Sequence, residues 1–138
     1  METLPEIKIS TDKSLLDIFV ICQFLKSSYW ASQRTEEDIK TSIENSICYG
    51  MYLDGKQIGF IRVLTDKIVF AYLMDVFILE EHRGNGYSKL LLNTILNSTD
   101  FQKVGRWVLI TKDAHWLYTK LGFTELAQPE RFMERRLK

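Results

Sequence analysis

The sequence predicts one mixed α/β domain over residues 1–138, with strands and helices packed around a single sheet. Three features indicate this fold class. An Asp54-Gly55 dipeptide separates two β-rich segments, a strongly apolar run extends from Ile68 to Leu79, and two later segments each lead from a strand pattern into a helix pattern. Because no internal repeat, linker or shift in composition divides the chain, one domain accounts for all of it.

The first third of the chain predicts a short strand and two helices. Alternation at Ile7 and Ile9 indicates the strand, and Asp12 then provides a helix N-cap. Apolar residues recur at three- and four-residue spacing along this helix: Leu15, Ile18, Phe19, Cys22 and Leu25. A loop with large aromatic side chains follows, and Thr35 to Asp38 is a capping-box start for a second helix that carries Ile39, Ile43 and Ile47.

The remaining segments predict the sheet and two further helices. Residues 51–53 and 58–61 form a hairpin, because both positions of its Asp-Gly turn tolerate positive φ. The run 68–79 is too apolar on both faces for an exposed sheet and is expected to be the central strand. A glycine-bearing loop, a helix near 91–96, a strand over 106–110 and a helix from Asp113 to Gly122 follow. A last strand is expected around Phe132 and Met133.

Composition excludes several classes of protein. The 18 Lys and Arg residues balance 18 Asp and Glu residues, and 46% of residues are hydrophobic, which rules out a disordered chain. A chain with zero net charge lacks the broad basic surface that general binding to nucleic acid or membranes requires, although a polyanion can still bind locally. The N-terminus has no export signal, so we expect a cytoplasmic protein. Cys22 and Cys48 lack metal-ligand spacing; we expect them to be reduced and buried, with no metal site.

The segment from Val76 to Leu91 favours an anion-binding site. A buried strand passes through a glycine-spaced loop into a helix, whose first N–H groups and dipole can hold phosphate oxygens. Arg83 adds a positive fork. A dinucleotide-binding loop is excluded because Lys89 stands where its third glycine is needed. The alternative is that these glycines only make an ordinary turn.

Together with a second motif, this loop resembles the GNAT superfamily of acyl-CoA N-acyltransferases. The family's pyrophosphate loop, Arg/Gln-x-x-Gly-x-Gly/Ala, is similar to residues 83–88, and its later signature, Ala-x-x-Leu-Tyr-x-x-x-Gly-Phe, is similar to residues 114–123. The resemblance implies a mixed, largely antiparallel sheet with flanking helices, in which a central parallel strand pair splays to admit the pantetheine arm. Two positions depart from the pattern, because Ser88 replaces Gly or Ala and Thr111 stands where Asn is frequent.

The resemblance also implies roles for individual residues. Tyr118 is carried toward the leaving sulfur as a catalytic acid; the alternative is a core tyrosine on an apolar helix face. The resemblance assigns backbone contacts with pantetheine to Val76, Phe77 and Ile78. Pyrophosphate contacts fall to Arg83, Gly84, Asn85, Gly86, Tyr87 and Ser88. Tyr29 and Trp30 are assigned to the wall of the acceptor site, or else to capping the core, and nearby Arg34 to an acceptor carboxylate or merely to solvent.

Asp75 is a candidate catalytic base on residue grounds. It is the only ionisable side chain in the run 68–79, and a buried carboxylate is costly unless it lines a wet site or has a partner. An amine acceptor arrives mostly protonated and has to lose a proton before it attacks. The alternative is a carboxylate satisfied by backbone groups or by a cation such as Arg62. His82 and His115 are weaker candidates: we expect His82 to be a solvated loop residue, and His115, three positions before Tyr118, to face either the site or solvent.

The function expected from the resemblance is transfer of an acetyl group from acetyl-CoA to a primary amine of a small molecule, by direct attack on the thioester. Two alternatives remain at this point: an acetyltransferase that acts on a protein amine, and a non-catalytic acyl-CoA-binding module that senses the cofactor or regulates a partner. The sequence leaves open whether the chain forms a homodimer.

Overall fold

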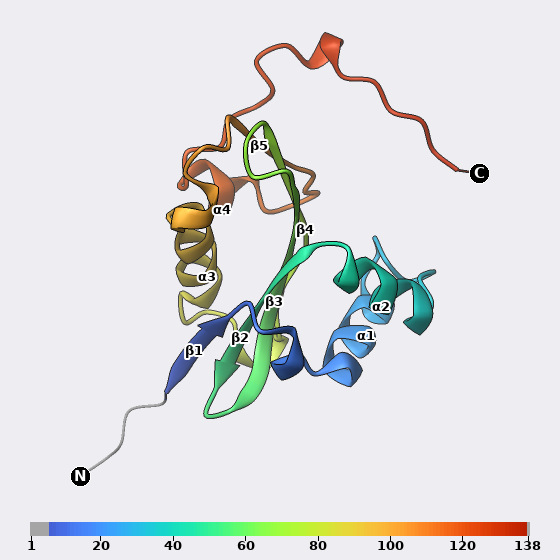
Figure 1. Ribbon diagram of the computed structural model, residues 1–138, viewed down its shortest axis with the longest axis vertical. Helices are drawn as coiled ribbons and strands as arrows, with labels where there is room; N and C mark the ends of the chain where they lie inside the picture. The colour runs from blue at the N-terminus through green and yellow to red at the C-terminus, as the bar shows by residue number, and fades with distance from the viewer. Residues whose placement is uncertain (1–5, 138) are drawn as a thin grey trace.

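The computed structural model describes residues 6–137 and forms one five-stranded sheet in the order β1-β2-β3-β4-β5. The strands are β1 (Ile7–Ser10), β2 (Ile47–Leu53), β3 (Lys56–Thr65), β4 (Phe70–Ile78) and β5 (Arg106–Leu109). The first four pair antiparallel, and β4 pairs parallel with β5. The predicted mixed sheet with one parallel pair is therefore confirmed (Figure 1). The run 68–79 is not the central strand, as was expected: it forms β4, next to the edge strand β5, and β3 is central in the sheet of residues 6–137.

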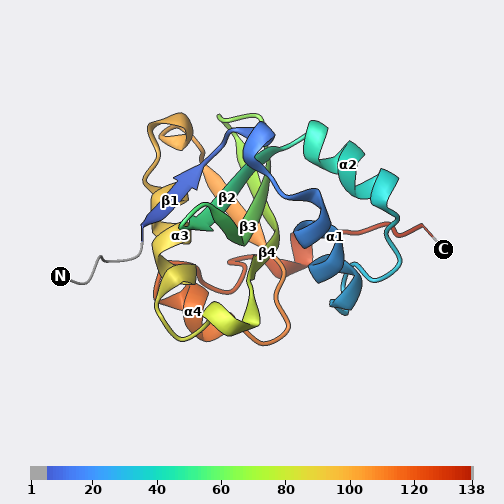
Figure 2. The ribbon, with the colours of Figure 1, turned by 90° about the horizontal axis from the view of Figure 1, so that it is seen from below.

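Helices cover both faces of this sheet. Two of them, α1 (Ile18–Ser27) and α2 (Glu36–Glu44), lie on one face, and α3 (Tyr87–Leu96) and α4 (His115–Thr119) lie on the other (Figures 1 and 2). Each pair covers its own core. Ile21, Leu25, Ile39, Phe60 and Phe77 are buried beneath α1 and α2. Leu73, Ile78, Leu91, Leu92, Ile95 and Tyr118 are buried between the sheet and α3 and α4.

The start of α1 differs from the prediction. Asp12 accepts a hydrogen bond from the Ser14 amide, but it caps the short 3-10 helix Lys13–Leu15, which Leu16 ends in extended backbone. The cap of α1 is Asp17, and Leu15 and Phe19 are 41% and 73% exposed. The apolar spacing identified the helix but not its first turn, because a local Asp-Ser hydrogen bond stabilises a tighter turn there.

Two further expectations on element boundaries were wrong. Ile47 begins β2 instead of ending α2, because α2 already ends at Glu44. The next residue, Asn45, has φ and ψ values of −102° and 14°, outside the helical region, and its backbone N–H donates to the Thr41 carbonyl. Ala114, not Asp113, is the N-cap residue of α4, and the Thr111 hydroxyl accepts from the Ala114 amide at 3.0 Å. Thr111 thus supplies the polar oxygen at this helix start.

The strand expected around Phe132 and Met133 does not form. Pro129 instead begins a 3-10 turn, Pro129–Arg131, after which the backbone continues without a sheet partner among residues 6–137. Met133 and Leu137 are 97% and 101% exposed. Adjacent apolar residues were the only signal for this strand. Phe132 instead lies beside Arg106, whose guanidinium carbon is 5.6 Å from the centre of its ring. The tail projects from the body of the molecule (Figure 1).

The β4–β5 ladder ends partway along β4. Its last pair is Leu73 with Leu109, where β5 ends, while β4 continues to Ile78. Between Met74 and Phe77, β4 contains one residue more than the facing part of β3, and Asp75 has a φ of 53°. This β-bulge lies where β4 loses its β5 partner, as the splayed pair of the expected fold requires.

Candidate active site

The glycine loop has the backbone form that the anion-site prediction needs. Gly84 and Gly86 have φ values of 82° and 77°, and an added Cβ would meet nothing within 4 Å at either position. Gly86 is the N-cap residue of α3, with no side-chain cap on the first turn. The first-turn N–H groups and the dipole of this helix therefore face open space.

Arg83 ties this loop to the end of β4. Its Nε donates to the carbonyl of Ile78 at 3.0 Å, and the Asn85 amide donates to the carbonyl of His82 at 3.1 Å. These bonds hold the loop directly after the part of β4 that has left β5. A guanidinium and a free helix N-terminus thus lie together at the end of the strand.

The residues predicted to contact pantetheine use their side chains for packing. Phe77 stacks on Phe24 with ring centroids 4.0 Å apart, on the α1 and α2 face. Ile78 is buried in the opposite core, and Val76 packs against that core. Their backbone lies beyond the last β5 partner, so the backbone is the part of these residues that a ligand in the opening would meet.

Tyr118 lies on α4, on the α3 and α4 face. Its ring is 7% exposed and meets the Phe123 ring edge-on at 5.7 Å. Burial raises the pKa of Tyr118 to about 12. Its hydroxyl makes no hydrogen bond within residues 6–137 and keeps access to solvent, whereas the Tyr52 hydroxyl is buried with no partner. A neutral phenol with an uncommitted hydroxyl is suited to proton donation.

Asp75 is held by four hydrogen bonds on the α1 and α2 face. Arg34 donates from Nη1 to both carboxylate oxygens at 2.8 Å. Arg62 donates from Nε at 3.0 Å, and the Trp30 indole donates at 3.1 Å. The Asp75 side chain is 1% exposed. We call Asp75, Arg34, Arg62 and Trp30 the Asp75 cluster. The sequence suggested Arg62 as a partner of Asp75, but it did not suggest that Arg34 would bind the same carboxylate.

The aromatic pair expected at the acceptor wall adjoins this cluster. The rings of Tyr29 and Trp30 meet edge-on at 5.3 Å, and the two residues are 64% and 40% exposed. Lys112, from the connection between β5 and α4, places its Nζ 5.2 Å from the centre of the Tyr29 ring. The structure therefore brings the aromatic pair, Arg34 and Asp75 together, as sequence separation alone could not reveal.

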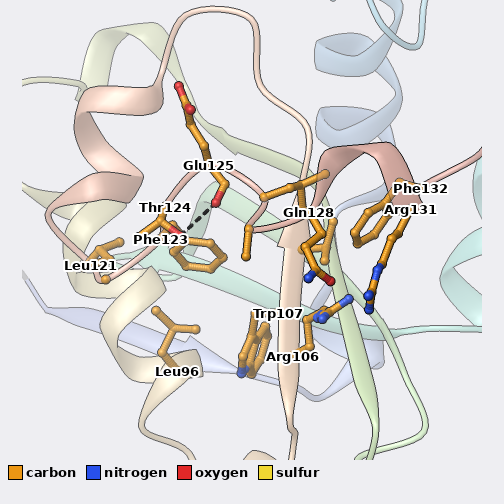
Figure 3. Close-up of a pocket in the computed structure, with 14 residues that line it drawn as sticks. Leu96, Arg106, Trp107, Leu121, Phe123, Thr124, Glu125, Gln128, Arg131 and Phe132 are labelled. Atoms are coloured by element: carbon orange, nitrogen blue, oxygen red, sulfur yellow. Dashed lines mark hydrogen bonds between the residues drawn. The ribbon is translucent and has the colours of Figure 1, made fainter.

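Two cavities lie apart from the Asp75 cluster and the aromatic pair. One, of about 520 Å³, lies between β5 and the segment after α4; Figure 3 shows Trp107 of β5 and Phe123 and Phe132 of that segment around it. The second, of about 730 Å³, lies between the start of α1 and the β2–β3 turn and includes His82. Beyond the Leu73–Leu109 pair, β4 continues without a β5 partner. No group of three metal-ligating side chains occurs in the part of the chain that the structure describes.

Comparisons with known proteins agree with this geometry. The family described as acetyltransferase (GNAT) domain matches residues 44–125. A Gibberella zeae protein that bears an acetyltransferase name is 31% identical, in an alignment that covers 81% of this chain and 75% of that protein. A crystal structure assigned to the GNAT acetyltransferases of Xanthomonas campestris pv. campestris has a TM-score of 0.92 and 43% identity, over 98% of this chain and 96% of that one. A Staphylococcus aureus protein, 21% identical, shares the fold with a TM-score of 0.77 over 96% of this chain and 100% of that one.

Proposed function

The chain belongs to the GNAT acetyltransferase family, and from this premise we propose that it transfers an acetyl group from acetyl-CoA to a primary amine of a small molecule. The observation that carries the proposal is the open glycine loop at the N-terminus of α3, placed directly after the stretch of β4 that has left β5. Backbone N–H groups and Arg83 there suit the pyrophosphate, and the unpaired β4 edge suits the pantetheine amides.

Direct attack fits the two-sided arrangement of the site. The amine approaches from the α1 and α2 face, where Tyr29, Trp30 and the Asp75 cluster lie, and Tyr118 lies on the other side of the sheet. After losing a proton, the amine nitrogen forms a bond to the thioester carbonyl carbon and gives up a second proton to water, and the C–S bond of the tetrahedral intermediate then breaks. The sulfur leaves with the bonding electrons and takes a proton from the Tyr118 hydroxyl, which solvent later restores.

Asp75 as the catalytic base remains a prediction, and its contacts favour the alternative. All four hydrogen bonds to its carboxylate come from guanidinium or indole N–H groups, and each carboxylate oxygen already accepts two of them. We propose that Asp75 acts as a positioning residue for Arg34 and Trp30, and that water removes the ammonium proton.

Two alternatives to this function are less well supported by the site. A non-catalytic acyl-CoA-binding module would use the same loop but release no thiol, and a protein amine would need room beside Trp30. The homodimer and the cytoplasmic location remain predictions. No helix among residues 6–137 is both long and apolar enough to cross a membrane.

The test is calorimetric binding of CoA together with thiol release from acetyl-CoA. Gly86→Val adds a side chain where the pyrophosphate would lie, and we expect it to abolish CoA binding in a folded protein. Gly55→Val is the matched control, because Gly55 has a φ of 85° with nothing within 4 Å of an added Cβ, so the backbone penalty is the same at a remote turn.

Unchanged CoA affinity in folded Gly86→Val would contradict the site. CoA binding without thiol release across a broad amine panel would favour the non-catalytic module instead.

A further inference from the structure

We infer that Arg34 forms an anion subsite for the acceptor, so that the preferred substrate is a primary amine that also carries a carboxylate or phosphate group. This inference rests on the proposed acetyl transfer and names the substrate class for the same site. It depends on the charge, the free donors and the position of Arg34.

The Asp75 cluster holds more positive than negative charge. Two guanidinium groups face one carboxylate, and Asp75 is the only acidic residue that forms an ion pair with Arg34 or Arg62 within residues 6–137. Lys112, in contact with the Tyr29 ring, adds another cation on this side. Because the Arg62 side chain is 7% exposed, surplus charge here is poorly screened, and an anion from the substrate would neutralise it.

Arg34 keeps half of its guanidinium for a ligand. Both hydrogen bonds to Asp75 come from Nη1, and Nε and Nη2 make no hydrogen bond within the described residues 6–137. Nε–H and Nη2–H form a parallel fork that matches the two oxygens of a carboxylate or phosphate. The Arg34 side chain is 27% exposed, so a small ligand reaches it from solvent.

The fork is held in place before any ligand binds. Asp75 is fixed by Arg62 and Trp30 as well as by Arg34, and the Arg34 amide donates to the carbonyl of Ala31 at 3.0 Å. An ordinary surface arginine loses side-chain entropy when it binds an anion, whereas Arg34 has already lost much of it through Asp75. A lone loop arginine is therefore a poor description of this residue.

The position assigns the anion to the acceptor and not to CoA. The pyrophosphate loop follows β4 and begins α3, whereas Arg34 contacts the bulge at Asp75, on the face covered by α1 and α2. The aromatic pair adjoins the same bulge. An amine carbon chain packed against these rings would place its anionic end on Arg34.

The experiment compares pairs of amines that differ in the anionic group: γ-aminobutyrate with butylamine, and phosphoethanolamine with ethanolamine. Their binding to CoA-saturated protein is measured by calorimetry, and acetylation is measured separately as thiol release. We expect the anionic member of at least one pair to bind about 10- to 100-fold more tightly, the range for a charged hydrogen-bonded pair. Arg34→Gln should remove that preference, and Arg34→Lys, which keeps the charge toward Asp75, should retain only part of it.

Lys103→Gln is the control, because Lys103 is exposed and its loss changes the net charge equally. It should leave the preference intact. Equal binding of both members in the wild type, no binding of any panel amine, or a full preference retained in folded Arg34→Gln would each overturn the inference. Arg34-dependent binding of the anionic amines without any thiol release would leave it standing and contradict the proposed transfer.

Discussion

The two faces of the sheet present positive charge in different ways. On the α3 and α4 face, Gly84, Gly86 and the first turn of α3 expose backbone N–H groups, and Arg83 is the only charged side chain of the loop that bonds to β4. On the α1 and α2 face, the guanidinium groups of Arg34 and Arg62, which lie far from Asp75 in the sequence, both donate to its carboxylate. The first site is made by contiguous residues, and the second by residues separated by 41 and 13 positions.

This difference determines how easily the ligand selectivity of each site can change. A backbone site recognises the shape of a pyrophosphate and tolerates little change in it, since its donors are fixed by glycine conformations. A site made of side chains depends on which residues happen to meet, so its selectivity changes with single substitutions. We therefore expect the α3 face to hold the common donor and the α1 face to set the acceptor.

The largest expected effect belongs to the α3 and α4 face. Tyr118→Phe removes only the hydroxyl and should lower kcat by roughly 10²- to 10⁴-fold while CoA affinity is kept. Because the pKa of Tyr118 is raised to about 12, its phenol stays protonated throughout the neutral range and should add no alkaline limb to the rate profile below about pH 11. A kcat within a factor of two of the wild type would remove Tyr118 from the mechanism.

The next effect probes the α1 and α2 face. Asp75→Asn leaves Arg34 and Arg62 without their counter-charge and should lower the free energy of unfolding by about 3–5 kcal/mol, the usual cost of breaking a buried ion pair. Urea unfolding measures it, with exposed Asp113→Asn as a control expected to stay within about 0.5 kcal/mol. If Asp75 positions Arg34 and is not the base, the acidic limb of kcat/KM should survive in a folded variant. Loss of that limb would restore Asp75 as the base.

A second tyrosine sharpens the interpretation of Tyr118. Burial also raises the pKa of Tyr52 to about 12, but its hydroxyl is sealed without a partner. A phenol whose pKa is higher in the folded state contributes stability at pH below 10, and that stability is lost as pH rises from 10 toward 12, by about 2–3 kcal/mol. Tyr52→Phe should match or exceed wild-type stability at pH 7 and reduce this alkaline loss, as measured by thermal unfolding at several pH values. An unchanged alkaline loss would place its origin elsewhere.

The smallest effect concerns the cap of α4. Thr111→Ala removes the oxygen that accepts from the Ala114 amide and should cost about 1 kcal/mol of unfolding free energy. Because α4 carries Tyr118, a fall in kcat of more than about 10-fold would correspond to more free energy than the helix loses, and would show that the cap also positions the phenol. Thr111→Asn should recover the stability, and failure to do so would contradict a capping role.

Local signals in the sequence predicted the α3 face better than the α1 face. The Asp-Gly hairpin and the strand-loop-helix order around Gly84 and Gly86 depend on neighbours in the chain, and both formed as predicted. The last helix also formed, but it spans only His115–Thr119 and ends before Gly122. Arg34 and Asp75 meet only because β4 and the loop after α1 are brought together by the fold, and no spacing rule covers such a pair. The Asp12 turn and the C-terminal segment failed for the opposite reason, since several local patterns were equally compatible with the same residues.

The extra residue in β4 decides which core each later residue of the strand enters. Ala71 and Leu73 face α3 and α4, and strict alternation would send Asp75 and Phe77 into that same apolar core. The bulge reverses the order, so that Phe77 packs beneath α1 and Asp75 turns toward Arg34. Pairing β4 with β3 without the bulge, with every residue kept, would not merely straighten the strand: it would exchange the faces of the residues from Asp75 onward, burying a carboxylate in hydrocarbon and leaving two arginines without a partner.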